Sequence, residues 1–270
     1  MIPIVISSYL RSPFTPAYKG ELATIRPDDM AAQVIKALVM KSGVKPEDIE
    51  DIMMGCAFPE GEQGLNIARL VTFIAGLPIS IAGTTINRFC GSSMQAIHSA
   101  AGAIACGSGE VFICAGVESM TRIPMAGFNP SPNPDLFESF PEAYESMGIT
   151  AENVAKKYDI SRKEQEEFAV SSHQKATNAA AKLLEEIVPI TGKHITVSQD
   201  GCVRSNTTVE TLSTLAPAFD KDGTVTAGTS SPLTDGAAAV LVCSEEYADR
   251  HNLPKLARIK SMAIRDGLTW

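Results

Sequence analysis

Basic residues are scarce in this sequence, which has 23 Lys and Arg against 31 Asp and Glu and a formal net charge of −8. Proteins that bind nucleic acids neutralise backbone phosphates with clustered Lys and Arg, so this balance argues against a nucleic-acid partner. An anionic small molecule can still bind, but only where the fold places a local positive group.

Long apolar runs are also missing. No stretch reaches the roughly 18 unbroken apolar residues of a membrane-spanning helix, so no membrane span is expected. The first residues, MIPIVISS, carry no basic region ahead of their short apolar run and no small-residue cleavage pattern. They predict a first strand rather than a signal peptide. With 270 residues, 44% of them hydrophobic, the chain can bury one or two ordinary cores.

Cysteine is present only in scattered positions. The 6 cysteines include no C-x-x-C pair and form no cluster with the 4 histidines, so neither a zinc site nor a disulfide framework is expected, and no metal is assigned. Cys56, Cys106, Cys114 and Cys243 lie in apolar stretches, where we expect buried, reduced thiols. This pattern favours a reducing compartment and predicts a cytoplasmic protein.

Short apolar segments alternate with helical patterns from residue 2 to about residue 116, which is typical of an α/β unit with parallel strands. The clearest helical pattern places Met30, Val34 and Leu38 on one face and ends at Gly43. Strands are expected at residues 2–7, 49–55, 84–88, 110–115, 224–227, 237–243 and 256–262.

The middle of the chain has a different character. Proline interrupts any regular pattern after residue 121, and Ser161 and Glu164 then form a capping box that predicts the start of a helix. Polar sequence follows before apolar strands resume. We therefore assign residues 122–221 to an inserted loop domain, and residues 1–121 and 222–270 to one α/β domain with a mixed sheet flanked by helices.

One cysteine stands apart from the others. Between Asn87 and Ile97 an expected strand runs into an alanine-rich helix, and Cys90 stands at the junction. The positive end of a helix dipole favours a thiolate, which makes this cysteine a candidate nucleophile near neutral pH, and Gly91 leaves room for a substrate. The spacing alone is also compatible with a small residue packed at a tight turn. The histidines are assigned structural or surface roles: His98, His173, His194 and His251.

Four blocks of the chain resemble the thiolase family, in the order in which that family carries them. NRFCGSSM at residues 87–94 resembles the nucleophile motif. GVESM at 116–120 and VTAGTSSPLTDGAAA at 225–239 resemble two further signatures, and MGITAEN at 147–153 is similar to the start of the loop domain. The likeness extends from the first strand to Trp270 and is to the N-terminal half of a thiolase.

The resemblance implies an acetyl-CoA C-acyltransferase. Cys90 would attack the 3-keto carbonyl of a 3-ketoacyl-coenzyme A, become acylated as acetyl-coenzyme A (acetyl-CoA) leaves, and pass the acyl group to a second CoA. CoA is then a substrate, and no permanently bound cofactor is expected. The family pattern places the CoA-binding residues at Met147, Arg204, Thr211, Ala227 and Ser231.

The resemblance covers only part of the catalytic set. The second half of a thiolase carries Gly-His-Pro and Cys-x-Gly-Gly-Gly motifs, and neither occurs in this sequence. Their histidine activates the nucleophile and their cysteine handles the enolate proton. The expectation is therefore that the C-terminal thiolase domain is absent, through a cut at the domain boundary or an incomplete gene product, and that the isolated chain is inactive.

Two departures bear on the branch of the family. Ser146 precedes Met147 where biosynthetic thiolases usually have His, and Thr229-Ser230-Ser231 replaces their Asn-Ala-Ser. Both favour a 3-ketoacyl-CoA thiolase of fatty-acid β-oxidation. The alternatives are a biosynthetic acetyl-CoA acetyltransferase and a non-catalytic fragment that binds CoA or assembles with a partner. The resemblance further implies a homodimer or tetramer and allows association with a hydratase/dehydrogenase subunit.

Overall fold

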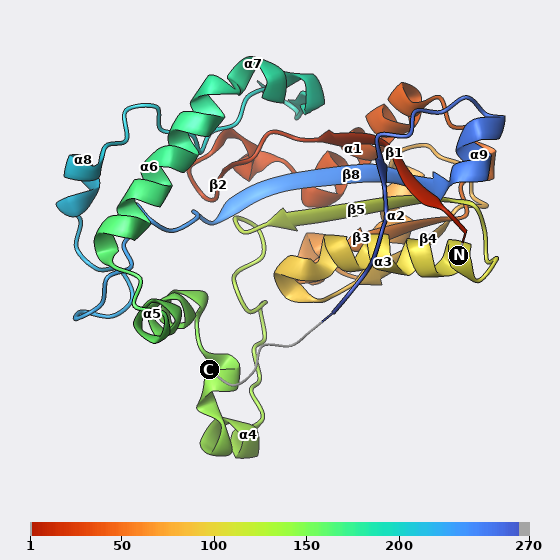
Figure 1. Ribbon diagram of the computed structural model, residues 1–270. Coiled ribbons are helices and arrows are strands. Elements are labelled where there is room, and N and C mark those ends of the chain that lie inside the picture. The colour runs from red at the N-terminus through yellow and green to blue at the C-terminus, as the bar shows by residue number, and fades with distance from the viewer. Residues whose placement is uncertain (1, 265–270) are drawn as a thin grey trace. The chain divides into compact units, whose positions relative to one another are not determined.

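The computed structural model describes residues 2–264 of the chain (Figure 1). These residues form two compact units. The first, called unit 1, comprises residues 2–128, Leu184–Gly201 and Leu233–Ala263, and the second, called unit 2, comprises Asn129–Leu183 and Cys202–Pro232. No helix within residues 2–264 has both the length and the apolar character needed to cross a bilayer.

Unit 1 is built on a mixed sheet of seven strands. Its strands are β1 (Ile4–Arg11), β2 (Thr15–Pro16), β3 (Asp51–Gly55), β4 (Ala82–Ile86), β5 (Val111–Ser119), β8 (Thr234–Ser244) and β9 (Ala257–Arg258). They lie in the order β4-β3-β5-β8-β1-β9, with β2 paired to β8. β3 runs parallel to β4 and β5, whereas β8 runs antiparallel to β5 and β1. The expected α/β fold with a mixed sheet is confirmed.

Helices cover both faces of this sheet (Figure 1). The long helices are α1 (Pro27–Ser42), α2 (Ile67–Ile74) and α3 (Ser92–Ala105). On one face α1 and α2 bury the larger core with strand residues such as Ile52 and Ile113. On the other face the small residues Ala96, Ala100 and Ala101 of α3 pack on the neighbouring strand positions. Side chains of a strand alternate between faces, so one sheet serves both layers.

The caps of α1 explain where it begins and ends. Pro27 occupies the first turn, where a missing N–H costs nothing, and Gly43 ends the helix with φ +72°. The shorter helices of unit 1 are η1 (Glu21–Thr24), η2 (Pro46–Asp48), η3 (Gly61–Gln63), η4 (Phe89–Gly91), η6 (Leu184–Glu186) and α9 (Glu245–Arg250).

Unit 2 is largely helical among its described residues. Its helices are α4 (Pro134–Ser139), η5 (Pro141–Tyr144), α5 (Met147–Lys157), α6 (Arg162–Asn178), α7 (Ala180–Leu183) and α8 (Val209–Ser213). The predicted capping box is confirmed at α6, where Ser161 Oγ accepts from the Glu164 N–H and the Glu164 carboxylate accepts from the Ser161 N–H. A similar reciprocal cap, made by Thr208 and Thr211, opens α8.

The sequence predicts an inserted domain over residues 122–221, whereas Leu184–Gly201 belongs to unit 1. This segment contains a hairpin of β6 (Ile190–Thr191) and β7 (Thr196–Val197), whose residues Ile190 and Val197 are buried in the larger core. Gln33 of α1 also exchanges hydrogen bonds of 3.1 and 2.9 Å with the hairpin backbone. Strands of two residues leave almost no periodic pattern in the sequence, so the return of this segment to unit 1 could not be predicted.

Three expected strands differ from the structure. β1 pairs antiparallel rather than within a parallel set, and β9 is much shorter than residues 256–262. The strand expected at 224–227 is wrong, because this segment belongs to unit 2 and makes only an isolated bridge between Thr226 and Pro217. Hydroxyl groups explain the turn, since Gly228 N–H donates to Thr226 Oγ1 (3.2 Å) and Ser230 Oγ donates to the Thr226 carbonyl (2.8 Å).

Candidate active site

Cys90 lies on a tight turn that leads from β4 into α3. It is exposed, and it belongs to η4, which continues directly into α3. Asn87 Oδ1 accepts a hydrogen bond from the Phe89 N–H (2.8 Å). Ser92 Oγ accepts one from the Arg88 N–H (2.8 Å) and donates to the Phe89 carbonyl (2.5 Å). Side chains on both sides of the cysteine therefore hold the turn while its thiol stays accessible.

The backbone of this turn is strained at Phe89, the residue before the cysteine. Its φ is +45°, in the left-handed region that residues other than glycine rarely adopt. Strained backbone of this kind costs on the order of 1–3 kcal/mol and is concentrated at functional sites. The Phe89 ring is 64% exposed, so burial of that ring does not account for the conformation.

Two glycines allow the first turn of α3 to approach the sheet. Gly55 ends β3, and Gly116 of β5 is its partner in the parallel register. A Cβ on Gly55 would lie 2.5 Å from the Ser93 nitrogen, and a Cβ on Gly116 would overlap Ser93 Oγ. A residue with a side chain would push the helix away at either position. The sheet thus fixes the position of the turn that carries Cys90.

The loop after β3 is attached to the same turn. Asn87 Nδ2 donates to the Ala57 carbonyl (2.9 Å), and the rings of Phe58 and Phe89 meet edge to face with centroids 6.1 Å apart. On the other side of the loop, the Glu118 carboxylate accepts from the Ala57 N–H (2.7 Å). These contacts connect the end of β5, the loop and the turn, so the surroundings of the cysteine are preorganised.

The remaining cysteines divide into buried and more accessible thiols. Burial raises the pKa of Cys56 to about 12, with the Glu118 carboxylate adding to the shift, and burial raises the pKa of Cys243 to about 12 as well. Burial also raises the pKa of Cys114. These positions agree with the expected inert thiols. Cys106 is a correction: it is exposed, because it follows the last turn of α3, beyond the face that packs on the sheet.

All predicted CoA-binding residues belong to unit 2 and are exposed, whereas Cys90 belongs to unit 1. Met147 is the first residue of α5 and is 65% exposed. Thr211 lies in α8, and its hydroxyl donates to the Thr208 carbonyl (2.8 Å) as part of the helix cap. Ala227 and Ser231 lie in the loop before β8. Their role in CoA binding stays a prediction.

The segments that carry these residues are joined within unit 2. The buried carboxylate of Glu152, on α5, accepts hydrogen bonds from the backbone at Thr224 and Val225. A Cβ on Gly228 would lie 2.5 Å from a side-chain carbon of Leu212, so α8 packs closely on this loop. α5, α8 and the loop therefore form one connected frame. The interpretation of the sequence overlooked Glu152, whose only signal is an acidic residue on the apolar side of a helix.

Arg204 lies on a segment fixed by a histidine. The Arg204 N–H donates to His173 Nδ1 (3.1 Å), which gives His173 of α6 the structural role expected for it. Further along, Arg162 pairs with the buried Glu166 (2.7 Å) and donates to the Leu215 carbonyl (2.5 Å), just beyond α8. The sequence pattern singled out neither residue of this pair.

Asp235, near the start of β8, holds the loop after β5. Its fully buried carboxylate accepts hydrogen bonds from the Thr121 N–H (2.9 Å) and from Ser119 Oγ (3.0 Å). His251 stacks on Tyr247 with ring centroids 4.2 Å apart, at the end of α9. Among the contacts of residues 2–264, neither Asp235 nor His251 is joined to the cysteine.

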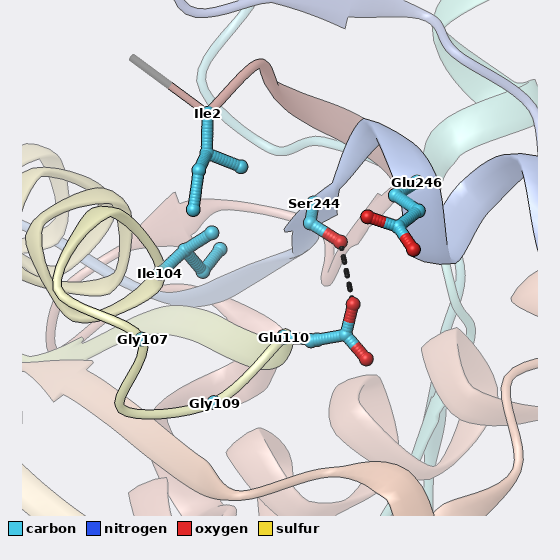
Figure 2. Close-up of a pocket in the computed structure, with 7 residues that line it drawn as sticks. All are labelled: Ile2, Ile104, Gly107, Gly109, Glu110, Ser244 and Glu246. Carbon is cyan, nitrogen blue, oxygen red and sulfur yellow. Dashed lines mark hydrogen bonds between the residues drawn. The ribbon is translucent and has the colours of Figure 1, made fainter.

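A hollow in unit 1 lies at the other end of α3. Figure 2 shows its lining residues, Ile2, Ile104, Gly107, Gly109, Glu110, Ser244 and Glu246. Its polar groups are already engaged, since Ser244 Oγ donates to Glu110 (3.1 Å) and Arg250 pairs with the same carboxylate (2.5 Å). Within residues 2–264, no group of three or more His, Cys, Asp or Glu side chains is arranged to hold a metal ion. The hollow contains no predicted site residue.

Comparison with known proteins connects these features to one family. The profile of the thiolase N-terminal domain matches residues 4–246. The chain is 46% identical to a 3-ketoacyl-CoA thiolase of Bacillus subtilis (strain 168), covering 96% of this chain and 70% of that protein. It is 44% identical to a 3-ketoacyl-CoA thiolase of Aliivibrio fischeri (strain ATCC 700601 / ES114), covering 97% of this chain and 70% of the relative.

Solved structures agree with the sequence relatives. The acetyl-CoA acetyltransferase of Bacillus anthracis matches with a TM-score of 0.84 at 36% identity, over 96% of this chain and 69% of that one. Human mitochondrial 3-ketoacyl-CoA thiolase, solved in complex with CoA, matches with a TM-score of 0.82 at 35% identity, over 95% and 68%. With its mixed sheet, its exposed cysteine at the start of α3 and these relatives, the chain belongs to the thiolase family, whose N-terminal domain it matches.

Proposed function

We propose that this chain supplies the nucleophile of a 3-ketoacyl-CoA thiolase, an acetyl-CoA C-acyltransferase that acts in fatty-acid β-oxidation. The observation that carries the proposal is Cys90, the exposed cysteine on a strained turn between β4 and α3. Relatives that match 96% and 97% of this chain are named 3-ketoacyl-CoA thiolase, and these names support the substrate class.

The chemistry proceeds in two half-reactions. The Cys90 thiolate attacks the C3 carbonyl of the substrate, the C2–C3 bond breaks, and its electron pair leaves as the enolate of acetyl-CoA, which takes up a proton. The acyl group stays on the cysteine as a thioester until the thiolate of a second CoA attacks it and releases the shortened acyl-CoA. The Cys90 backbone N–H, at the start of the helical segment, is a candidate donor for the developing oxyanion.

CoA acts in this scheme as a substrate, and no resident cofactor is required. The proposed CoA contacts come from unit 2: Met147, Arg204, Thr211, Ala227 and Ser231. Arg204 offers a positive charge in a chain of net charge −8, which suits the phosphates of the nucleotide end. The resemblance to the family assigns Ser231 and Met147 to the pantetheine arm. Both side chains are exposed and uncharged, which is compatible with that role.

Assembly and location belong to the same proposal. A homodimer or tetramer is favoured by the position of β4 at the edge of the sheet, where it pairs only with β3 among residues 2–264, and by the exposed side chains of Leu65 and Phe73. Exposed strand edges and apolar patches are surfaces that proteins cover by association. We also propose a hydratase/dehydrogenase subunit as a partner. A cytoplasmic location is favoured because the cysteines are free thiols, as in proteins of reducing compartments.

The acyl-enzyme is the direct test. The full-length protein is incubated with a 3-ketoacyl-CoA in the absence of free CoA, and the acyl group is located by mass spectrometry of its peptides. The expected result is an acyl thioester on Cys90 that disappears in Cys90→Ser. An acyl group on another cysteine, with Cys90 unmodified, would contradict the assignment.

A biosynthetic acetyl-CoA acetyltransferase is the second candidate, favoured by the fold match to the Bacillus anthracis enzyme of that name. Cleavage rates on short and long 3-ketoacyl-CoA substrates separate the two. Activity confined to acetoacetyl-CoA would favour the biosynthetic branch. A non-catalytic role in CoA binding or assembly applies to residues 1–270 on their own and is tested by assaying them separately.

A further inference from the structure

Glu152 is a buried acid that fastens a loop in unit 2. It lies on α5, is only 2% exposed, and faces the segment that leads into the loop of Ala227 and Ser231. Its carboxylate accepts from the Thr224 N–H (2.9 and 3.0 Å) and from the Val225 N–H (2.7 Å). Charge-assisted bonds of this kind are about twice as strong as neutral ones, and they satisfy a carboxylate that burial would otherwise disfavour.

The residue before these donors is Gly223, which leaves space for the Glu152 carboxylate because it has no side chain. A Cβ on Gly223 would lie 2.5 Å from the Glu152 carboxyl carbon, so a larger residue there would displace the carboxylate. Immediately after the donors, Thr226 is fully buried and begins the hydroxyl-bonded turn that presents Ala227 and Ser231. We call the hydrogen bonds from the Thr224 and Val225 N–H groups to the Glu152 carboxylate the clamp. The clamp fixes the start of that turn relative to α5.

The same arrangement occurs elsewhere in the protein. Glu50 accepts from the backbone N–H groups of Glu110 (3.0 Å) and Val111 (2.9 Å), and a Cβ on the preceding Gly109 would lie 2.7 Å from its carboxyl carbon. That clamp sits at the first residue of β5, in unit 1 and at the end of the strand remote from Gly116. It serves the sheet and offers a matched comparison for the clamp of Glu152.

We propose that Glu152 is a positioning residue for CoA, acting through Thr224 and Val225 on the loop of Ala227 and Ser231. The proposal rests on the CoA-binding role proposed above for that loop. Because α5 also begins with Met147, one carboxylate holds together two of the segments assigned to CoA. Loss of the clamp lets the loop shift against α5 and weakens CoA binding, whereas Cys90, in the other unit, keeps its own supports.

The test compares Glu152→Gln with Glu50→Gln in the full-length protein. Glutamine has nearly the same shape but loses the charge and one acceptor oxygen, so both variants should lose similar thermal stability. Glu152→Gln should raise the KM for CoA by about tenfold, with kcat at saturating CoA within about twofold of wild type. Glu50→Gln should leave the KM for CoA unchanged. Gly223→Ala, which keeps the carboxylate but displaces it, should reproduce the effect of Glu152→Gln.

The outcomes are distinguishable. If Glu152→Gln and Gly223→Ala lose stability but keep the KM for CoA, while Arg204→Ala raises it, the positioning role is overturned and the CoA site stands. If none of these variants changes the KM for CoA, the proposed CoA site itself is wrong. A fall in kcat at unchanged KM would equally overturn the proposal, because it would place the effect of Glu152 on the chemical step. Should Glu152→Gln not fold, Gly223→Ala decides the question alone.

Discussion

Gly55 and Gly116 lie side by side on β3 and β5, and the first turn of α3 occupies the space that their side chains would fill. The approach is so close that Ser93 would touch a Cβ at either position. The position of Cys90 is therefore decided by two glycines, one at the end of β3 and one within β5, that have no functional group of their own.

Gly116→Ala should reduce activity more than it reduces stability. The added methyl group must displace Ser93 and the start of α3, and overpacking of this kind costs about 1–3 kcal/mol in stability. A displacement of the nucleophile by about 1 Å can lower a rate on the order of 100-fold. Thermal melting and kcat of the full-length protein measure the two effects.

Gly102→Ala is the matched control for Gly116→Ala. It adds the same methyl group within α3, where the new Cβ would meet no described atom within 4 Å apart from its chain neighbours and the backbone of its own helix. Alanine is the better helix former, so this variant should gain about 0.5–1 kcal/mol and keep its activity. Full activity of Gly116→Ala would show that the close approach does not matter for catalysis.

Alkylation should separate the cysteines by exposure and pKa. With limiting iodoacetamide near neutral pH, Cys90 should react before Cys56 and Cys243, because burial raises the pKa of both to about 12 and leaves almost no thiolate. Cys106 is exposed and is the competitor, so a Cys106→Ser background isolates the effect. Peptide mass mapping that finds Cys56 modified in folded protein ahead of Cys90 would contradict this expectation.

Much of the fold could be predicted where local chemistry is strong. The end of α1 follows from Gly43, and the start of α6 follows from its capping box. What could not be predicted depends on distant partners. The hairpin around Ile190 returns to unit 1 through burial against α1, and Glu152 acquires its role only when Thr224 folds back onto α5. No local pattern encodes such long-range contacts.

Arg204→Ala should weaken the binding of CoA without affecting the chemical step. An exposed cation that meets a phosphate contributes up to about 1 kcal/mol, so the KM for CoA should rise about two- to fivefold at unchanged kcat. Lys163→Ala is the control, because Lys163 is an exposed cation of the same unit that pairs only with Glu167 at 3.8 Å among the described residues and is not assigned to CoA. Equal effects of the two variants would point to general electrostatics instead of a contact.

Residues 1–270 on their own should not complete thiolysis. The cleavage step needs a group to protonate the enolate and one to activate the incoming thiol, and the family pattern places neither in this sequence. Each such group typically contributes 10²- to 10⁴-fold, so turnover should lie near background. Cleavage of 3-ketoacyl-CoA is measured with residues 1–270 alone and then with a separately produced C-terminal thiolase half. Robust turnover by residues 1–270 before mixing would refute the view that these acid/base groups come from the C-terminal half.

The left-handed conformation of Phe89 has a consequence for laboratory evolution. Glycine adopts φ +45° without strain, so Phe89→Gly removes a local cost while it loosens the backbone beside Cys90 and deletes the ring that meets Phe58. A library selected for heat resistance alone would be drawn to glycine at this site, whereas one selected for turnover would retain the aromatic residue. The two selection pressures diverge at one codon next to the nucleophile.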